Sequence, residues 1–144
     1  MFMSITRSIF RNEALKDQPA NVVVTNLNNF LLDETEHLNM STIFVTFLYT
    51  RFHLAQNSLS YVNAGHCLPV ILRQKKIIEL KNPHIFLGQF PENYIEYKHD
   101  WLPGDLFLAY TDGITEEVDS GNSMYKTERL YQTLLEHGHE GKSL

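Results

Sequence analysis

The feature that most constrains the fold is a series of short β-prone segments, separated by turn-length connections, in the middle of the chain. Their residues are β-branched, aromatic or alternately polar and apolar, which is typical of buried and half-buried strands. The segments cover residues 41–50, 57–65, 68–74, 75–80, 93–102 and 106–110. We predict a tight turn near Gln74-Lys75 and another at Pro103-Gly104-Asp105. Because hairpin-length connections join antiparallel neighbours, the sequence predicts antiparallel pairing.

Helical periodicity lies on both sides of this series. We predict helices over residues 1–15, 19–33 and 126–137, with Pro19 near the first turn of the second helix and Gly138 ending the third. The predicted class is therefore α+β, a layered sandwich of antiparallel sheets flanked by helices, in a single domain. The face of the first helix that we expect to pack on the sheet consists of Phe2, Ile5, Ile9 and Phe10.

Charge and cysteine content exclude several classes of protein. The net charge is −5 and the basic residues form no stripe, so a nucleic acid partner is not expected. Cys67 is the single cysteine, which fits a reducing compartment. No apolar run approaches the roughly 20 residues that span a bilayer, and the first residues do not form a signal peptide. We expect a cytoplasmic protein without a membrane segment.

The segment LPGDLFLAYTDGITEEV raises the question of chemistry, because an apolar strand leads to Asp112 and Gly113. A carboxylate at a strand end is well placed to bind Mg²⁺ or Mn²⁺, which prefer oxygen ligands, and a glycine lets a ligand approach closely. An Asp-Gly pair is also a common turn after a strand. The residues alone leave both interpretations open.

Other polar residues admit a chemical role and a structural one. His66 follows Asn63 in a predicted turn, where a histidine serves as an acid, base or ligand, or stabilises the turn by a hydrogen bond. Cys67 has no base partner in sequence, which favours a small buried residue over a nucleophile. Glu116, with Glu117 and Asp119, would add metal ligands or form a solvated loop.

Three blocks together resemble one family, the bacterial metal-dependent serine/threonine phosphatases of the PPM superfamily. The specific motifs are YVNAGH, LPGDLFLAYTDGITE and the YTDG core within it, and the similarity runs from about residue 1 to 135. The branch that the chain resembles is the stage II sporulation protein E type, which includes regulators of sigma factors.

The resemblance implies a site and a pathway. In this family the aspartate of the TDG motif binds a two-metal centre of Mn²⁺ or Mg²⁺, which makes Asp112 a metal ligand and Gly113 its neighbour. His66, Asn63 and Glu116 would lie at the outer edge of the site. The implied substrate is a phosphorylated anti-sigma-factor antagonist, and an upstream sensor domain and a homodimer are further expectations.

The chain departs from the family in one respect. The other metal aspartates, from an N-terminal strand, an Asp-Val-Ser-Gly-His-Gly-like turn and a final strand, have no counterpart here. The sequence therefore looks truncated at both ends, and we expect this chain by itself to be inactive. The alternative is a non-catalytic binding or regulatory module that keeps the fold.

Overall fold

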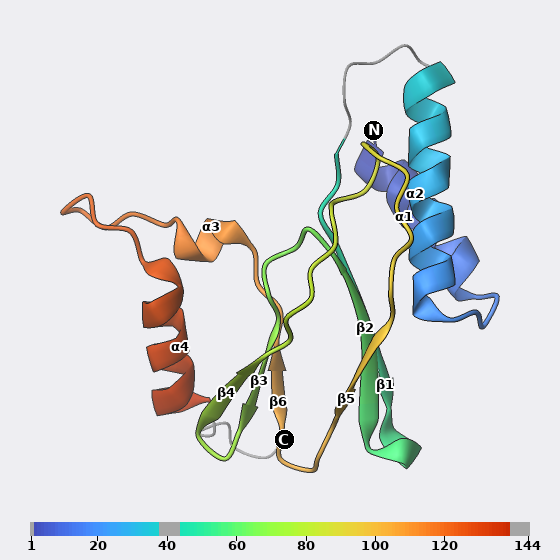
Figure 1. Cartoon of the computed structure of the whole chain (residues 1–144). Coiled ribbons are helices and arrows are strands. Elements are labelled where there is room, and N and C mark those ends of the chain that lie inside the picture. Colours follow the sequence, from blue (N-terminus) through green and yellow to red (C-terminus); the bar gives the residue numbers. More distant parts are fainter. Residues whose placement is uncertain (1, 38–43, 139–144) are drawn as a thin grey trace. The chain divides into compact units, whose positions relative to one another are not determined.

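The computed structural model describes residues 2–37 and 44–138, apart from the side chains of residues 2, 3 and 5. The chain divides into two compact units, Met1–His66 with Asn82–Trp101, and Cys67–Lys81 with Leu102–Leu144. The α-helices and strands, labelled in Figure 1, are α1 (Phe2–Ala14), α2 (Ala20–His37), β1 (Phe47–His53), β2 (Ser58–Ala64), β3 (Val70–Arg73), β4 (Lys76–Glu79), β5 (Tyr97–Asp100), β6 (Leu106–Leu108), α3 (Asp112–Thr115) and α4 (Lys126–His137). A 3-10 turn (Leu54–Gln56) lies between β1 and β2.

The first unit contains α1, α2 and a three-stranded antiparallel sheet in the order β1-β2-β5. The register pairs Phe47 with Ala64 at one end of the β1–β2 hairpin and His53 with Ser58 at the other. Asn57 has a positive φ of 48° in the connection, a conformation that asparagine tolerates better than most residues. The central strand β2 is buried along nearly its whole length.

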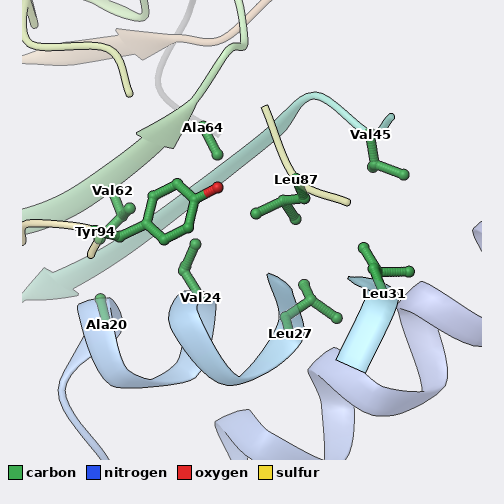
Figure 2. Packing of buried hydrophobic residues seen from close by; sticks show 9 residues of the cluster. All are labelled: Ala20, Val24, Leu27, Leu31, Val45, Val62, Ala64, Leu87 and Tyr94. Atoms are coloured by element: carbon green, nitrogen blue, oxygen red, sulfur yellow. The ribbon is translucent and has the colours of Figure 1, made fainter. Parts of the chain in front are cut away.

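The core of the first unit lies between α2 and this sheet. Figure 2 shows apolar side chains of α2 directed toward strand and loop residues. Phe10 of α1 adds edge-to-face contacts with Phe47 and Tyr49, with ring centroids 5.1 and 5.0 Å away. Ile9 and Phe10 therefore pack on this core as predicted, whereas the Phe2 and Ile5 side chains lie outside the described residues. The buried cluster consists of Ala20, Val24, Leu27, Leu31, Val45, Val62, Ala64, Leu87 and Tyr94.

The loop between β4 and β5 is fixed to this unit by polar contacts. The buried Asn28 side chain donates to Phe90 O at 2.9 Å and accepts from Gly88 N at 2.8 Å. The Glu96 carboxylate accepts from Ala20 N at 3.1 Å, which satisfies one of the free N–H groups at the start of α2. These hydrogen bonds fix the long irregular segment between β4 and β5 to α2.

The second unit contains α3, α4 and a smaller antiparallel sheet in the order β4-β3-β6. Gln74 and Lys75, with φ of 47° and 60°, form the predicted tight turn between β3 and β4. Before β6, Asp105 N donates to Leu102 O at 3.0 Å, and Gly104 has a φ of 88° after Pro103. This is the type II turn in which proline and glycine occupy their preferred positions.

A buried ion pair joins β3 to the turn before β6. The Arg73 guanidinium donates to both carboxylate oxygens of Asp105, at 2.9 and 2.7 Å. The Asp105 side chain is 1% exposed and also accepts from Leu102 N at 2.8 Å. Such a bidentate pair fixes both geometry and charge.

The α+β class with two small antiparallel sheets and flanking helices is confirmed. The predicted helices are confirmed as well, with bounds that differ by at most four residues. Strand boundaries differ from prediction because strand length depends on the partner. Only Tyr97–Asp100 of the 93–102 segment pairs with β2, and only Leu106–Leu108 of the 106–110 segment pairs with β3. The first strand begins at Phe47, later than predicted, and residues 41–43 lie outside the described part.

Within the described residues, no helix is long and apolar enough to cross a membrane.

Candidate active site

Asp112 is the first residue of the one-turn helix α3, which the sequence interpretation missed by placing this aspartate directly at a strand end. β6 already ends at Leu108, and Thr111 is extended, with φ −108° and ψ 163°. Asp112 O accepts hydrogen bonds from Glu116 N at 2.8 Å and Thr115 Oγ1 at 3.1 Å. A threonine before an acidic first residue is a helix-start signal, which could have revealed α3 from the sequence.

The Asp112 side chain is exposed. Among the described residues, no hydrogen bond or ion pair engages its carboxylate. Its oxygens therefore remain able to bind a ligand. The hollow beside it is lined by Gly113, Ile114, Glu117 and Tyr125, which include a single carboxylate.

Gly113 is not required by the geometry of its own unit. Its φ is not positive, and an added Cβ would meet only Thr111 Oγ1, at 3.6 Å, an ordinary van der Waals contact. Backbone strain and internal packing therefore do not explain the glycine.

The acidic residues after α3 have separate roles. Glu116 and Glu117 are exposed. The Asp119 carboxylate accepts from Gly121 N at 2.8 Å and Ser123 N at 3.0 Å. These bonds, first the one from Ser123, lower the pKa of Asp119 below its ordinary value. Asp119 therefore stabilises a turn, in agreement with the loop interpretation.

Cys67 is a neighbour of Asp112 that its sequence position did not reveal. Burial raises the pKa of the Cys67 thiol, the nearby Asp112 and Glu116 carboxylates raise it further, and the Asp112 N–H acts in the opposite direction. The protonated thiol is thus favoured. Cys67 is half-buried, whereas the sequence favoured a buried residue. The tertiary structure brings Cys67 to Asp112 across 45 positions of sequence, since 112 − 67 = 45.

Asn63 and His66 belong to the first unit, where Asn63 holds the turn after β2. The fully buried Asn63 side chain accepts from His66 N at 2.8 Å and donates to His66 O at 3.0 Å. Gly65 has a φ of 70°, and a Cβ there would lie 2.9 Å from Phe86 Cβ. The conformation and packing of this turn account for Asn63 and Gly65 of the YVNAGH motif. Its proximity to Asp112 stays a prediction.

A contact between α4 and β4 also escaped the sequence analysis. Tyr131 of α4 donates to Glu79 Oε1 of β4 at 2.9 Å. Burial raises the pKa of Tyr131 far above its ordinary value, and the nearby Tyr110 and Glu79 side chains raise it further. Tyr131 follows Glu79 by 52 positions, so no local sequence pattern predicts this contact.

The residues that the structure describes fit a metal centre only in part. Asp112 offers the hard oxygen donor that Mn²⁺ and Mg²⁺ prefer. Within residues 2–37 and 44–138, no three or more His, Cys, Asp or Glu side chains are grouped so that they could hold a metal ion. The described residues therefore offer one metal ligand, Asp112, and do not form a complete metal centre.

Similar proteins agree with this fold. The SiaA-PP2C domain of Pseudomonas aeruginosa superimposes with a TM-score of 0.75 at 14% identity, covering 94% of this chain and 54% of that one. PppA, a key regulatory component of T6SS in Pseudomonas aeruginosa, gives a TM-score of 0.63 at 17% identity, covering 94% of this chain and 73% of PppA.

Sequence comparison identifies the family. Protein IcfG of Synechocystis sp. is 32% identical over 104 residues, which are 69% of this chain and 16% of IcfG. A family model described as Stage II sporulation protein E (SpoIIE) matches residues 1–144. The fold and these matches define a PP2C-type, or PPM, serine/threonine phosphatase domain. The chain belongs to the SpoIIE family, whose phosphatases are metal-dependent and act on phosphoproteins.

Proposed function

We propose that residues 1–144 form part of a single PPM-type domain that removes phosphate from phosphoserine or phosphothreonine in a protein. The family match over the whole chain carries the proposal. One residue also supports the proposal. The Asp112 side chain is exposed, and no hydrogen bond or ion pair among the described residues engages its carboxylate. The chain spans 16% of IcfG and about half of the SiaA domain, so the activity of a whole protein is part of the proposal.

In this proposal Asp112 supplies one oxygen ligand to Mn²⁺ or Mg²⁺, and Gly113 leaves room for the ligand to approach. A pair of such ions, when bound, activates water and stabilises the charge that develops on the phosphoryl group. His66, Asn63 and Glu116 would lie at the outer edge of the site. Asn63 holds the His66 backbone through two hydrogen bonds.

We further propose a phosphorylated anti-sigma-factor antagonist as the substrate, because the motifs resemble the branch that regulates sigma factors. An upstream sensor domain would control the activity, and a homodimer would be the working assembly. The cytoplasm is the proposed location, which the single cysteine supports.

A second candidate function is a non-catalytic binding or regulatory module. The absence of a grouped ligand set within the described residues favours it. A module of this kind would keep the fold and bind its protein partner without turnover. Metal-dependent activity separates the two candidates.

The test compares this chain with a longer one that adds the Asp-Val-Ser-Gly-His-Gly-like turn and a final aspartate-bearing strand. We expect the longer chain to hydrolyse a phosphoserine protein with Mn²⁺ and to lose about 100-fold or more in rate on Asp112→Asn, since a metal-bound centre depends on each carboxylate. The 144-residue chain should show no Mn²⁺-dependent turnover.

Asp119→Asn in the longer chain is the matched control. The Asp119 carboxylate accepts the hydrogen bonds of a turn, so its substitution should leave the rate nearly unchanged. Robust turnover by the 144-residue chain would contradict the expected inactivity. A longer, folded chain that is active and indifferent to Asp112→Asn would remove Asp112 from the site.

A further inference from the structure

The loop between α3 and α4 is held in a defined conformation by its own hydrogen bonds. Val118 and Met124 pair as an antiparallel bridge, and Tyr125 N donates to Glu117 O at 2.8 Å. The Asp119 carboxylate closes the tip of the loop by accepting from two backbone N–H groups. The loop therefore presents its side chains from a backbone that is held in place.

Apolar side chains are exposed on this loop and on the helix before it. Ile114, Val118 and Met124 are 44, 43 and 54% exposed. Ile114 lines a hollow of about 290 Å³ and Val118 lines another of about 320 Å³, and Glu117 and Tyr125 line both. The three apolar residues and these hollows thus form one surface, which we call the α3–α4 surface. Apolar residues grouped in this way are typical of an interaction site.

The charge around the α3–α4 surface is negative. From Asp112 to Arg129 the chain has five carboxylates and two cations, a formal charge of 2 − 5 = −3. Glu116 and Glu117 are exposed, and no hydrogen bond or ion pair among the described residues engages their carboxylates. The Arg129 guanidinium lies over the Tyr125 ring, 5.0 Å from its centroid. A partner that covers the apolar residues must therefore bring positive charge to these carboxylates, because covering them without a cation is costly.

We propose that the α3–α4 surface docks a basic amphipathic segment of a partner protein. Apolar side chains of the segment contact Ile114, Val118 and Met124, and its lysine or arginine side chains lie beside Glu116 and Glu117. Apolar burial supplies the affinity, whereas the charges select the partner and speed its approach. The surface involves no metal at Asp112 and no turnover, so it is compatible with both candidate functions.

The experiment titrates the isotope-labelled 144-residue chain with a short synthetic helical peptide that has leucine on one face and lysine on the other. A second peptide of the same pattern has glutamate in place of lysine. Backbone amide chemical shifts locate the contact, and their dependence on peptide concentration gives the dissociation constant. We expect the lysine peptide to shift the amides of residues 113–125 and the glutamate peptide to leave them unchanged.

Two substitutions test the charge and the apolar part of the surface separately. Glu117→Lys replaces an attraction with a repulsion, and should weaken binding of the lysine peptide about tenfold. Its matched control is Glu36→Lys, which changes the net charge equally at an exposed position of α2.

Met124→Ser removes apolar contact area, and should also weaken binding about tenfold. Its matched control is Leu54→Ser, because Leu54 is 71% exposed and lies in the first unit. Both controls should bind the lysine peptide as the unsubstituted chain does. All four substitutions replace exposed side chains, and far-UV circular dichroism checks that each variant is folded.

Three outcomes would overturn the proposal. The first is equal binding of the two peptides, and the second is a loss of binding in Glu36→Lys or Leu54→Ser as large as in its counterpart. The third is self-association of the chain, measured by analytical ultracentrifugation, that Met124→Ser abolishes, since the surface would then bind a second copy. None of these outcomes concerns the role of Asp112, which the phosphatase assay tests.

Discussion

The two units of the molecule differ in how they use their apolar residues. In the first, α2 contributes Val23, Val24, Leu27 and Leu31 to the interior, and β2 is buried from Leu59 to Ala64. In the second, no residue of α3 or α4 is buried, and the apolar interior consists mainly of β3. The first unit therefore has a closed core, whereas the second relies more on polar contacts and exposes the segment that carries Asp112.

This difference agrees with a general separation between stability and function. Binding groups commonly lie on exposed, weakly packed segments that a firm scaffold supports. Asp112 lies in an exposed segment of this kind. Substitutions in the two units should therefore have different effects.

The largest expected effect tests the core of the first unit. Leu27 is fully buried in the cluster, so Leu27→Ala should lower the free energy of unfolding by about 4 kcal/mol. Leu130→Ala on the half-buried face of α4 should cost about 1 kcal/mol, because less apolar surface leaves the interior. Urea denaturation followed by far-UV circular dichroism measures both. Equal costs would contradict the contrast between the units.

The second prediction tests the reliance of the second unit on polar contacts. Arg73→Met leaves the Asp105 carboxylate buried without its cation, and should destabilise the chain by about 3 kcal/mol. Lys81→Met removes the cation of an exposed pair with Glu79 at 3.9 Å, and should change stability by less than about 0.5 kcal/mol. If the two variants unfold at the same urea concentration, the buried pair does not support this unit.

A smaller effect is expected at the turn after β2. Asn63→Ala leaves the His66 N–H and C=O without the side chain that binds both, and should cost about 2 kcal/mol. Asn29→Ala, at an exposed position of α2, should stay within about 0.5 kcal/mol of the unsubstituted chain. A cost for Asn63→Ala no larger than that of Asn29→Ala would show that the turn holds without the amide.

The smallest effect is local and depends on pH. Hydrogen bonds from Ser123 and Gly121 lower the pKa of Asp119 from the ordinary 3.8. A lowered pKa stabilises the turn above pH 3.8, and this contribution is lost as pH falls through the lower folded value. The Gly121 and Ser123 amide chemical shifts should therefore titrate with a midpoint below 3.8.

Asp119→Asn provides the control for this titration, because the amide keeps an acceptor oxygen and does not titrate in this range. A midpoint at or above 3.8 in the unsubstituted chain would mean that the turn does not favour the charged carboxylate.

The amino-acid sequence determined the elements that depend on neighbouring residues. Helical periodicity predicted α1, α2 and α4, and turn chemistry predicted the tight turns at Gln74-Lys75 and Pro103-Gly104. These features follow from backbone conformation and local spacing, which a short window of sequence specifies. Asp112 was likewise singled out by a local pattern, the TDG motif that follows an apolar run.

Only the tertiary structure decided which segments meet. β2 pairs with β1 and β5, and not with β3, which follows it directly, because each strand pairs where apolar faces and register agree across the chain. Cys67 reaches Asp112, and Tyr131 reaches Glu79, over 45 and 52 positions of sequence, given 112 − 67 = 45 and 131 − 79 = 52. Contacts between residues so far apart in sequence depend on how whole helices and strands pack, and local composition does not predict them.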